Sequence, residues 1–192
     1  GTLEIEKSIK KGGKGDTHKQ LQRTAINWLY CNGCSVFAEE VPTGNGVADA
    51  LGVRTRDKDD HRVYYIEAKA SRSDLICAKQ KGVYLRSIGA EISKCYYHSF
   101  KKFPGMDGEN HADKMANMCP DCIKIRDGAG DTGIDFYYLI VANGVKVEPS
   151  LYPEWGVLDE NAKVIRRAKR MKRKTDSKPI IENIAHVLVY KV

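Results

Sequence analysis

The stretch that decides the fold is YYIEAKASRSD, residues 64–74. It begins with aromatic and apolar residues, which is typical of a buried strand, yet Glu67 and Lys69 stand two positions apart within it. Side chains two apart on a strand point to the same face, so this carboxylate and this ammonium are expected side by side. Charged groups seldom lie within a sheet without a partner or a chemical role. The pair is therefore a plain ion pair or part of a reactive site.

The patterns on both sides of this strand predict the order of the other elements. The expected order is helix, three strands, helix and strand, over residues 17–32, 34–41, 47–55, 62–70, 75–92 and 134–142. A further short strand should follow the loop PSLYPEWGVL, and a last helix should begin at Pro179. A basic strand or strand end is expected over 164–174. This order indicates an α/β fold with a mixed central sheet flanked by helices.

Length and composition favour one globular domain over residues 1–192. The chain has 192 residues, enough for a full core, and 42% of them are hydrophobic. No apolar run approaches the roughly 20 residues that cross a membrane, and the first residues have no signal-peptide pattern. We therefore expect a cytoplasmic protein with no membrane partner. A homodimer is left open.

The charge balance points to a polyanionic partner. The formal net charge is +7 and the sequence pI is about 9.0. A chain with this excess of Lys and Arg favours nucleic acid first among such partners. The alternative is a soluble protein that is basic without any such partner.

A second acidic residue is expected beside Glu67. Asp49 lies on the strand before it, and the polar segment RDKDDH joins the two strands as a short hairpin. Two carboxylates this close repel each other unless a cation lies between them. Oxygen ligands favour Mg²⁺ or Mn²⁺, with water in the remaining positions. Lys69 would then orient water or stabilise charge in a transition state.

These residues carry a resemblance to a known family. Asp49, seventeen residues, and then Glu67-Ala68-Lys69 resemble the motif of the PD-(D/E)xK nuclease superfamily, which includes type II restriction enzymes and archaeal Holliday-junction resolvases. Ala48 stands where the family motif has Pro. The longer runs VFAEEVPTGNGVADALGV, YYIEAKASRSDL and PEWGVL are most similar to the MmcB-like group of DNA-repair proteins.

The resemblance implies a restriction-endonuclease-like αβββαβ core and a role for each residue of the motif. Asp49 and Glu67 would hold the metal, with the Ala68 carbonyl as a third ligand. Glu40, near the end of the preceding strand, would add a carboxylate or bind through water. Lys69 would be the catalytic lysine.

The resemblance also directs attention to the first helix. Many relatives carry a Glu there, whereas this chain offers His18 and Gln22. Either side chain can hold a water molecule, but neither replaces a carboxylate. A reaction that needs two metal ions is therefore less well supported than one that needs a single ion.

Two groups of residues are candidates for contact with DNA. The first follows the motif and the second lies in the run RRAKRMKRK, in which seven of nine residues are basic. The candidates are Ser71, Arg72, Ser73 and Lys79, and then Arg166, Arg167, Lys169 and Arg170. Phosphate contacts of this kind steepen the salt dependence of binding without reading sequence. The alternative for the basic run is a solvated sheet edge that its charge protects from aggregation.

A cysteine-containing insertion is expected over 93–132. It is weakly periodic, and Cys119 and Cys122 have the spacing of two thiolates on one tetrahedral Zn²⁺. Cys95 and His98 are the first candidates for the remaining ligands. The alternates are His111 and Cys77. Structural zinc would supply folding free energy to this segment, whereas free cysteines in a reducing cell are the simpler alternative.

The sequence thus favours a metal-dependent DNA nuclease acting in repair, recombination or phage DNA processing. One alternative is a DNA-binding module on the same fold that does not cleave. A second is a zinc-organised interaction protein in which Glu67 and Lys69 are purely structural. A third keeps the nuclease chemistry but acts on RNA.

Overall fold

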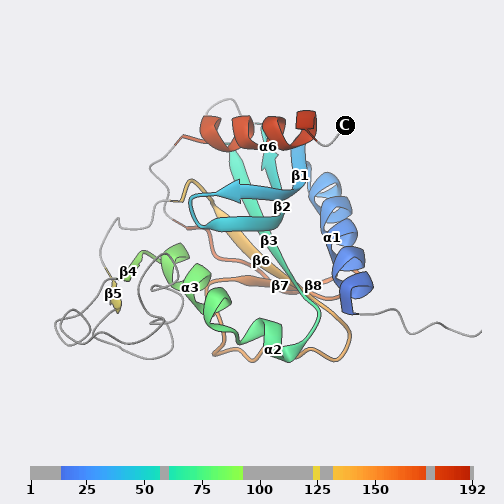
Figure 1. Cartoon of the computed structure of the whole chain (residues 1–192), viewed down its shortest axis with the longest axis vertical. Helices are drawn as coiled ribbons and strands as arrows, with labels where there is room; N and C mark the ends of the chain where they lie inside the picture. Colours follow the sequence, from blue (N-terminus) through green and yellow to red (C-terminus); the bar gives the residue numbers. More distant parts are fainter. Residues whose placement is uncertain (1–13, 57–60, 93–122, 126–131, 172–175, 191–192) are drawn as a thin grey trace, which may run out of the picture.

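The computed structural model describes residues 14–56, 61–92, 123–125, 132–171 and 176–190. A six-stranded mixed sheet forms the centre (Figure 1). In spatial order its strands are β1 (Val36–Thr43), β2 (Gly46–Arg54), β3 (Arg62–Lys69), β6 (Phe136–Val141), β7 (Gly156–Leu158) and β8 (Val164–Arg166). The first three strands are antiparallel, β3, β6 and β7 run parallel, and β8 is antiparallel to β7. The predicted α/β class is therefore confirmed.

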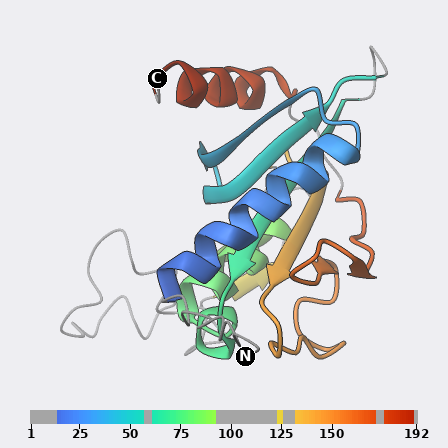
Figure 2. The ribbon, with the colours of Figure 1, turned by 90° about the vertical axis from the view of Figure 1, so that its right-hand side faces the viewer.

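Helix α1 (Lys14–Cys31) covers one face of this sheet (Figure 2). Leu21, Ala25 and Leu29 recur every four residues, so they fall on one side of the helix, and all three are buried. They pack against β2, β3 and β6 in a single apolar cluster. The helix ends where Gly33 adopts a φ of +84°, a conformation that glycine takes at little cost.

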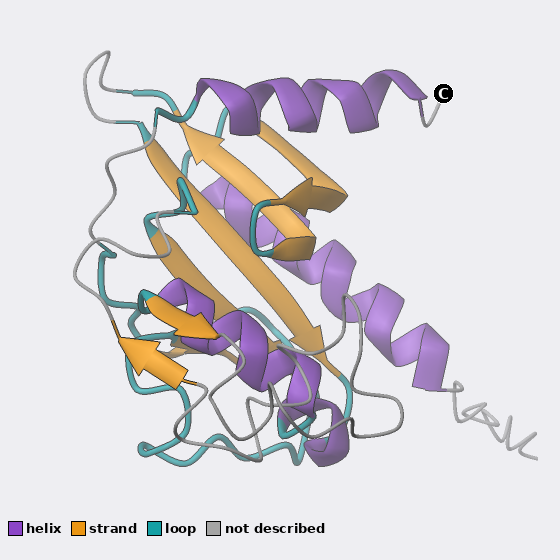
Figure 3. Cartoon of the chain, turned by 60° about the vertical axis from the view of Figure 1, so that its left-hand side comes forward, coloured by secondary structure: helices purple, strands orange, loops and turns teal. Residues whose placement is uncertain are grey.

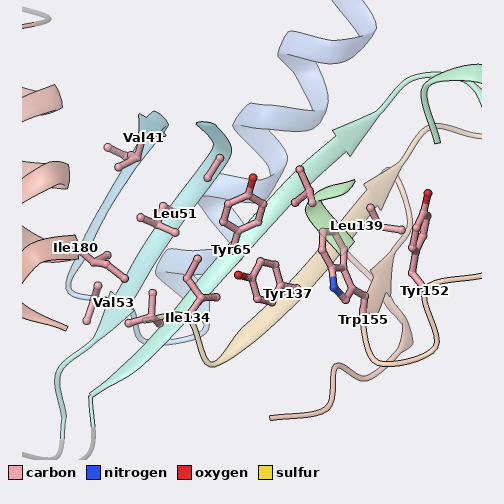
Figure 4. Packing of buried hydrophobic residues seen from close by; sticks show 14 of the residues in the cluster. Val41, Leu51, Val53, Tyr65, Ile134, Tyr137, Leu139, Tyr152, Trp155 and Ile180 are labelled. Atoms are coloured by element: carbon pink, nitrogen blue, oxygen red, sulfur yellow. The ribbon is translucent and has the colours of Figure 1, made fainter. Parts of the chain in front are cut away.

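The opposite face is covered by α2 (Arg72–Leu75), α3 (Ala78–Ser87) and α6 (Lys178–Tyr190). Their buried residues form the second and larger core with the facing sides of the strands. Aromatic rings fill its centre, because Tyr65, Tyr137 and Trp155 are each fully buried and lie in mutual contact (Figure 4). The sheet is thus buried on both faces over β3 and β6, where the charged pair also lies.

The segment predicted as one helix over 75–92 is divided. Ser71 begins α2 by accepting the backbone N–H of Asp74, and the thiol of Cys77 accepts the backbone N–H of Gln80 at the start of α3. The chain then enters a short strand, β4 (Ala90–Ile92), which pairs with β5 (Ile123–Ile125) (Figure 3). The prediction missed these breaks because the apolar spacing carries no signal for two successive caps.

The β4–β5 ladder lies at the start of the predicted insertion. Its register pairs Ile92 with Ile123, so the residues before and after 93–122 are neighbours. The predicted zinc ligands Cys95, His98, Cys119 and Cys122 all lie outside the described residues. No helix within the described ranges has the length and apolar character needed to traverse a bilayer.

Candidate active site

The site lies where β2 leaves β3. The two strands pair from Arg54 opposite Arg62 to Ala50 opposite Ile66, and their pairing ends there, although β3 continues alongside β6. Asp49 is the first residue of β2 beyond this ladder. Its Oδ2 accepts the backbone N–H of Ala68 at 2.7 Å. The carboxylate thus binds the N–H that continued strand pairing would otherwise have used.

An irregularity in β1 and β2 sets the direction of Asp49. Ala48 and Leu51 are three positions apart on β2, yet they belong to the same core, whereas regular alternation puts residues three apart on opposite faces. The break falls at Asp49 and at Glu40, which lies opposite it on β1 with a φ of +53°. A left-handed backbone is uncommon at Glu, and such irregularities often direct a side chain at a functional site.

Helix α1 supplies the other contacts of Asp49. The Nε2 of His18 lies 3.2 Å from Oδ1, and the amide of Gln22 donates to the same oxygen at 3.5 Å. His18 and Gln22 are four residues apart, so they face the same way on the helix. They are the two first-helix residues that the sequence offered in place of a Glu.

Glu67 lies on β3 next to Ala68, the residue whose N–H Asp49 binds. Its Oε2 accepts the Lys69 ammonium at 3.1 Å, and its Oε1 accepts the Tyr65 hydroxyl at 2.6 Å. Residues 65, 67 and 69 alternate onto one face of β3, and for Glu67 and Lys69 this shared face was predicted from their spacing. Glu67 is only 8% exposed and Lys69 only 9%. The charged pair is therefore inside the protein rather than on its surface.

Burial is the largest influence on Glu67. It raises the pKa of the Glu67 carboxyl, the nearby Lys69 ammonium lowers it, and the Asp49 carboxylate raises it again, with a net upward shift. A carboxyl perturbed by desolvation and by named charged neighbours is common in active sites, although structural ion pairs do the same. The negative charge of Asp49 is thus one of the causes that raise the pKa of Glu67.

Asp49 and Glu67 lie on neighbouring strands and offer carboxylate oxygens, the ligand type that a hard divalent cation takes. Mg²⁺ is usually held by one or two carboxylates and keeps several waters, and Asp49 and Glu67 supply two carboxylates. The N–H and C=O of one strand residue point to the same edge, so the Ala68 carbonyl faces the side on which Asp49 binds its N–H. Within the part of the chain that is described, no group of three or more His, Cys, Asp and Glu side chains forms a metal site.

Comparisons of the chain with models of protein families, with curated proteins and with solved structures gave no significant match.

Among the candidates for DNA contact that follow the motif, Ser71, Arg72 and Ser73 make contacts within the protein. Ser71 accepts the backbone N–H of Asp74, and its hydroxyl also contacts that of Ser73 at 2.9 Å. The exposed Arg72 pairs with Glu148 at 2.6 Å. Lys79 is exposed near the start of α3. These residues lie immediately after the strand that carries Glu67 and Lys69.

The basic run divides into structural and exposed residues. The Arg166 guanidinium donates to the carbonyls of Leu151, Tyr152 and Trp155 at 2.8–3.0 Å, so its donors are used to fix that loop. We therefore remove Arg166 from the phosphate-contacting set. Arg167 is exposed, and two further members of the run pair with acidic residues. These pairs are Lys169 with Glu154 and Arg170 with Asp135.

One residue of the site was not singled out from the sequence. Tyr65 donates to Glu67 directly, but in the sequence it counted only among the aromatic residues that are typical of a buried strand. The available signal was its position, since a Tyr two residues before Glu67 on a strand must share its face. That spacing is the argument that predicted the neighbouring Glu67–Lys69 pair.

Proposed function

We propose that this chain is a metal-dependent DNA nuclease with a restriction-endonuclease-like core of the PD-(D/E)xK type. One observation carries the proposal: the Asp49 carboxylate binds the backbone between Glu67 and Lys69. An isolated Glu–Lys ion pair does not need a second carboxylate at that point. A site for phosphodiester hydrolysis does, because it must hold a cation beside a lysine.

The arrangement of the elements supports the proposal. The order α1, β1, β2, β3, helix and β6 agrees with the αβββαβ order that the resemblance implies. In addition, β3 is antiparallel to β2 and parallel to β6. The acidic residues and the lysine come from the neighbouring strands β2 and β3, in the order that the motif has.

The residues would divide the chemistry among them. Asp49 and Glu67 would hold Mg²⁺ or Mn²⁺ with the Ala68 carbonyl, and Glu40, on the strand β1 that pairs with β2, would contribute through water. When bound, the metal would act as a Lewis acid toward the scissile phosphate and toward water. Lys69 would orient the attacking water and stabilise the negative charge that develops on the phosphate.

The charge favours a nucleic acid as the substrate, and the resemblance to DNA nucleases favours DNA. The net charge of +7 attracts any polyanion, and Lys79, Arg167 and Lys169 are exposed. Contacts from such residues bind the phosphate backbone and carry no sequence preference of their own. We therefore propose that they position the duplex or strand, while Asp49 and Glu67 select the bond to be cut.

The proposal is tested with the purified chain and a panel of nucleic acids. Single-stranded, duplex, flap and four-way DNA, and RNA of matched sequence, are incubated with Mg²⁺, Mn²⁺ or EDTA. Cleavage of a DNA that requires the metal supports the proposal, and preferential cleavage of RNA reassigns the substrate. Binding without cleavage favours the non-cleaving module instead. If the chain neither binds nor cleaves any of these nucleic acids, the proposal is contradicted.

A further inference from the structure

The hydroxyl of Tyr65 is committed to Glu67. It lies 2.6 Å from Oε1 of Glu67 and 3.5 Å from the carbonyl of Val47. A hydroxyl has one proton to donate, and the shorter contact to a carboxylate is much the stronger. The Tyr65 hydroxyl is therefore the donor of a short hydrogen bond to this carboxylate.

The ring of Tyr65 has little freedom to move. The residue is fully buried, with the ring centroids of Tyr137 and Trp155 at 5.0 and 6.3 Å (Figure 4). Close-packed side chains of this kind hold one rotamer, because any other would open a void or clash. The hydroxyl is therefore a fixed donor, whereas Lys69 has a flexible four-carbon side chain.

Each oxygen of the Glu67 carboxylate has its own hydrogen-bond donor. Lys69 binds Oε2 and Tyr65 binds Oε1, so the carboxylate cannot rotate about its terminal bond without losing one of them. Each carboxylate oxygen accepts more than one bond. The lone pairs that remain are thus held in one direction while both donors are in place.

We propose that Tyr65 is a positioning residue, whose hydroxyl fixes the Glu67 carboxylate so that it can hold a divalent cation while Lys69 stays beside it. This inference rests on the proposed function. Without the hydroxyl, Glu67 turns toward Lys69 and forms a closer ion pair, which competes with the metal. Groups that orient a metal ligand from behind typically contribute 10–100-fold to metal affinity.

The test is calorimetric titration of metal-free protein with Mn²⁺ and with Mg²⁺, in the absence of DNA. We expect Tyr65→Phe to bind either ion about tenfold more weakly than wild type. Tyr137→Phe is the matched control, because its hydroxyl is also buried but contacts Asn45 and Thr132, at 3.2 and 2.6 Å. The control should retain the wild-type affinity, and thermal unfolding of both variants checks the fold.

Cleavage assays provide a second measurement, which would not change if Tyr65 had a purely structural role. The metal concentration for half-maximal cleavage should rise about tenfold in Tyr65→Phe, and saturating metal should restore kcat. Equal metal affinity in Tyr65→Phe and wild type overturns the inference and leaves the proposed function standing. Wild type that binds neither ion overturns both.

If Tyr65→Phe does not fold, ¹⁹F NMR of fluorotyrosine-labelled protein provides the test. Mg²⁺ should shift one tyrosine resonance of the otherwise wild-type chain, and Glu67→Gln should shift the same resonance without metal. Resonances that are insensitive to Mg²⁺, or that respond to Mg²⁺ but not to Glu67→Gln, contradict the proposed role.

Discussion

The carboxylate of Asp49 accepts the backbone N–H of Ala68 at 2.7 Å, which ties β2 to β3 beyond the end of their ladder. The bond has two consequences. It satisfies a backbone donor of a residue that is only 2% exposed, and it brings a second acid beside the charged pair of β3. Structural and chemical roles of Asp49 are therefore combined in one side chain, and substitutions can separate them.

Asp49→Asn and Asp49→Ala should differ in stability but not in activity. Asn keeps an oxygen that accepts the Ala68 N–H, whereas Ala leaves that donor unsatisfied at a cost of about 1–3 kcal/mol. Urea unfolding should therefore place Asp49→Asn within about 1 kcal/mol of wild type and Asp49→Ala below it. Both variants should lose metal-dependent cleavage. Retained cleavage by Asp49→Asn would remove Asp49 from the site.

The free energy of unfolding of metal-free protein should depend on pH through Glu67. Its pKa is raised in the folded state above the ordinary 4.5, so the native state binds more protons than the unfolded state above that value. Stability must then fall as pH rises from about 4.5 toward the raised pKa. Glu67→Gln removes this titration, and its stability relative to wild type should increase over the same range. Parallel curves for the two proteins, measured in EDTA, would refute the raised pKa.

Substitutions of two adjacent arginines of the basic run should affect different properties, stability for Arg166 and DNA binding for Arg167. Arg166→Ala frees three carbonyls of the 151–155 loop and should lower the unfolding free energy by about 2 kcal/mol. Arg167→Ala should change stability by less than about 0.5 kcal/mol. It should instead weaken DNA binding and flatten the plot of log K against log salt by about 1. A salt slope that is identical in Arg167→Ala and wild type would take Arg167 out of the DNA interface.

The contact between β6, β7 and the chain after β8 can be tested at Gly156. A methyl group there would meet the Tyr138 ring and come within 2.8 Å of the Ala168 backbone nitrogen. Gly156→Ala should therefore lower the unfolding free energy by about 3 kcal/mol. Gly44→Ala is the control, because nothing lies within 4 Å of the added carbon. Equal stability of the two variants would contradict the β6–β7 register.

Local patterns were sufficient for much of the fold. The apolar spacing within residues 17–32 predicted the first helix, and the spacing of Glu67 and Lys69 predicted that they share a face. Both inferences depend only on the period of a helix or strand. The same is true of β6, whose unbroken apolar run is typical of a strand buried on both faces.

Features set by distant parts of the chain were not predicted. The irregularity at Glu40 and Asp49 depends on how β1 and β2 pack between α1 and the opposite core, and no local sequence pattern predicts it. Arg166 resembles its basic neighbours in sequence, yet the path of the 151–155 loop alone decides that it binds carbonyls. The break between α2 and α3 likewise depends on caps at Ser71 and Cys77, residues that a periodicity argument treats as ordinary polar positions.

The central claim is that Asp49, Glu67 and Lys69 form a metal-dependent site that cuts DNA. The most direct measurement compares DNA cleavage by wild type and Lys69→Met in Mg²⁺, with binding to the same DNA measured in parallel. We expect wild type to cleave only when the metal is present, and Lys69→Met to bind with similar affinity but cleave at least about 100-fold more slowly. Equal cleavage by the two proteins, or cleavage by wild type that persists in EDTA, would contradict the claim.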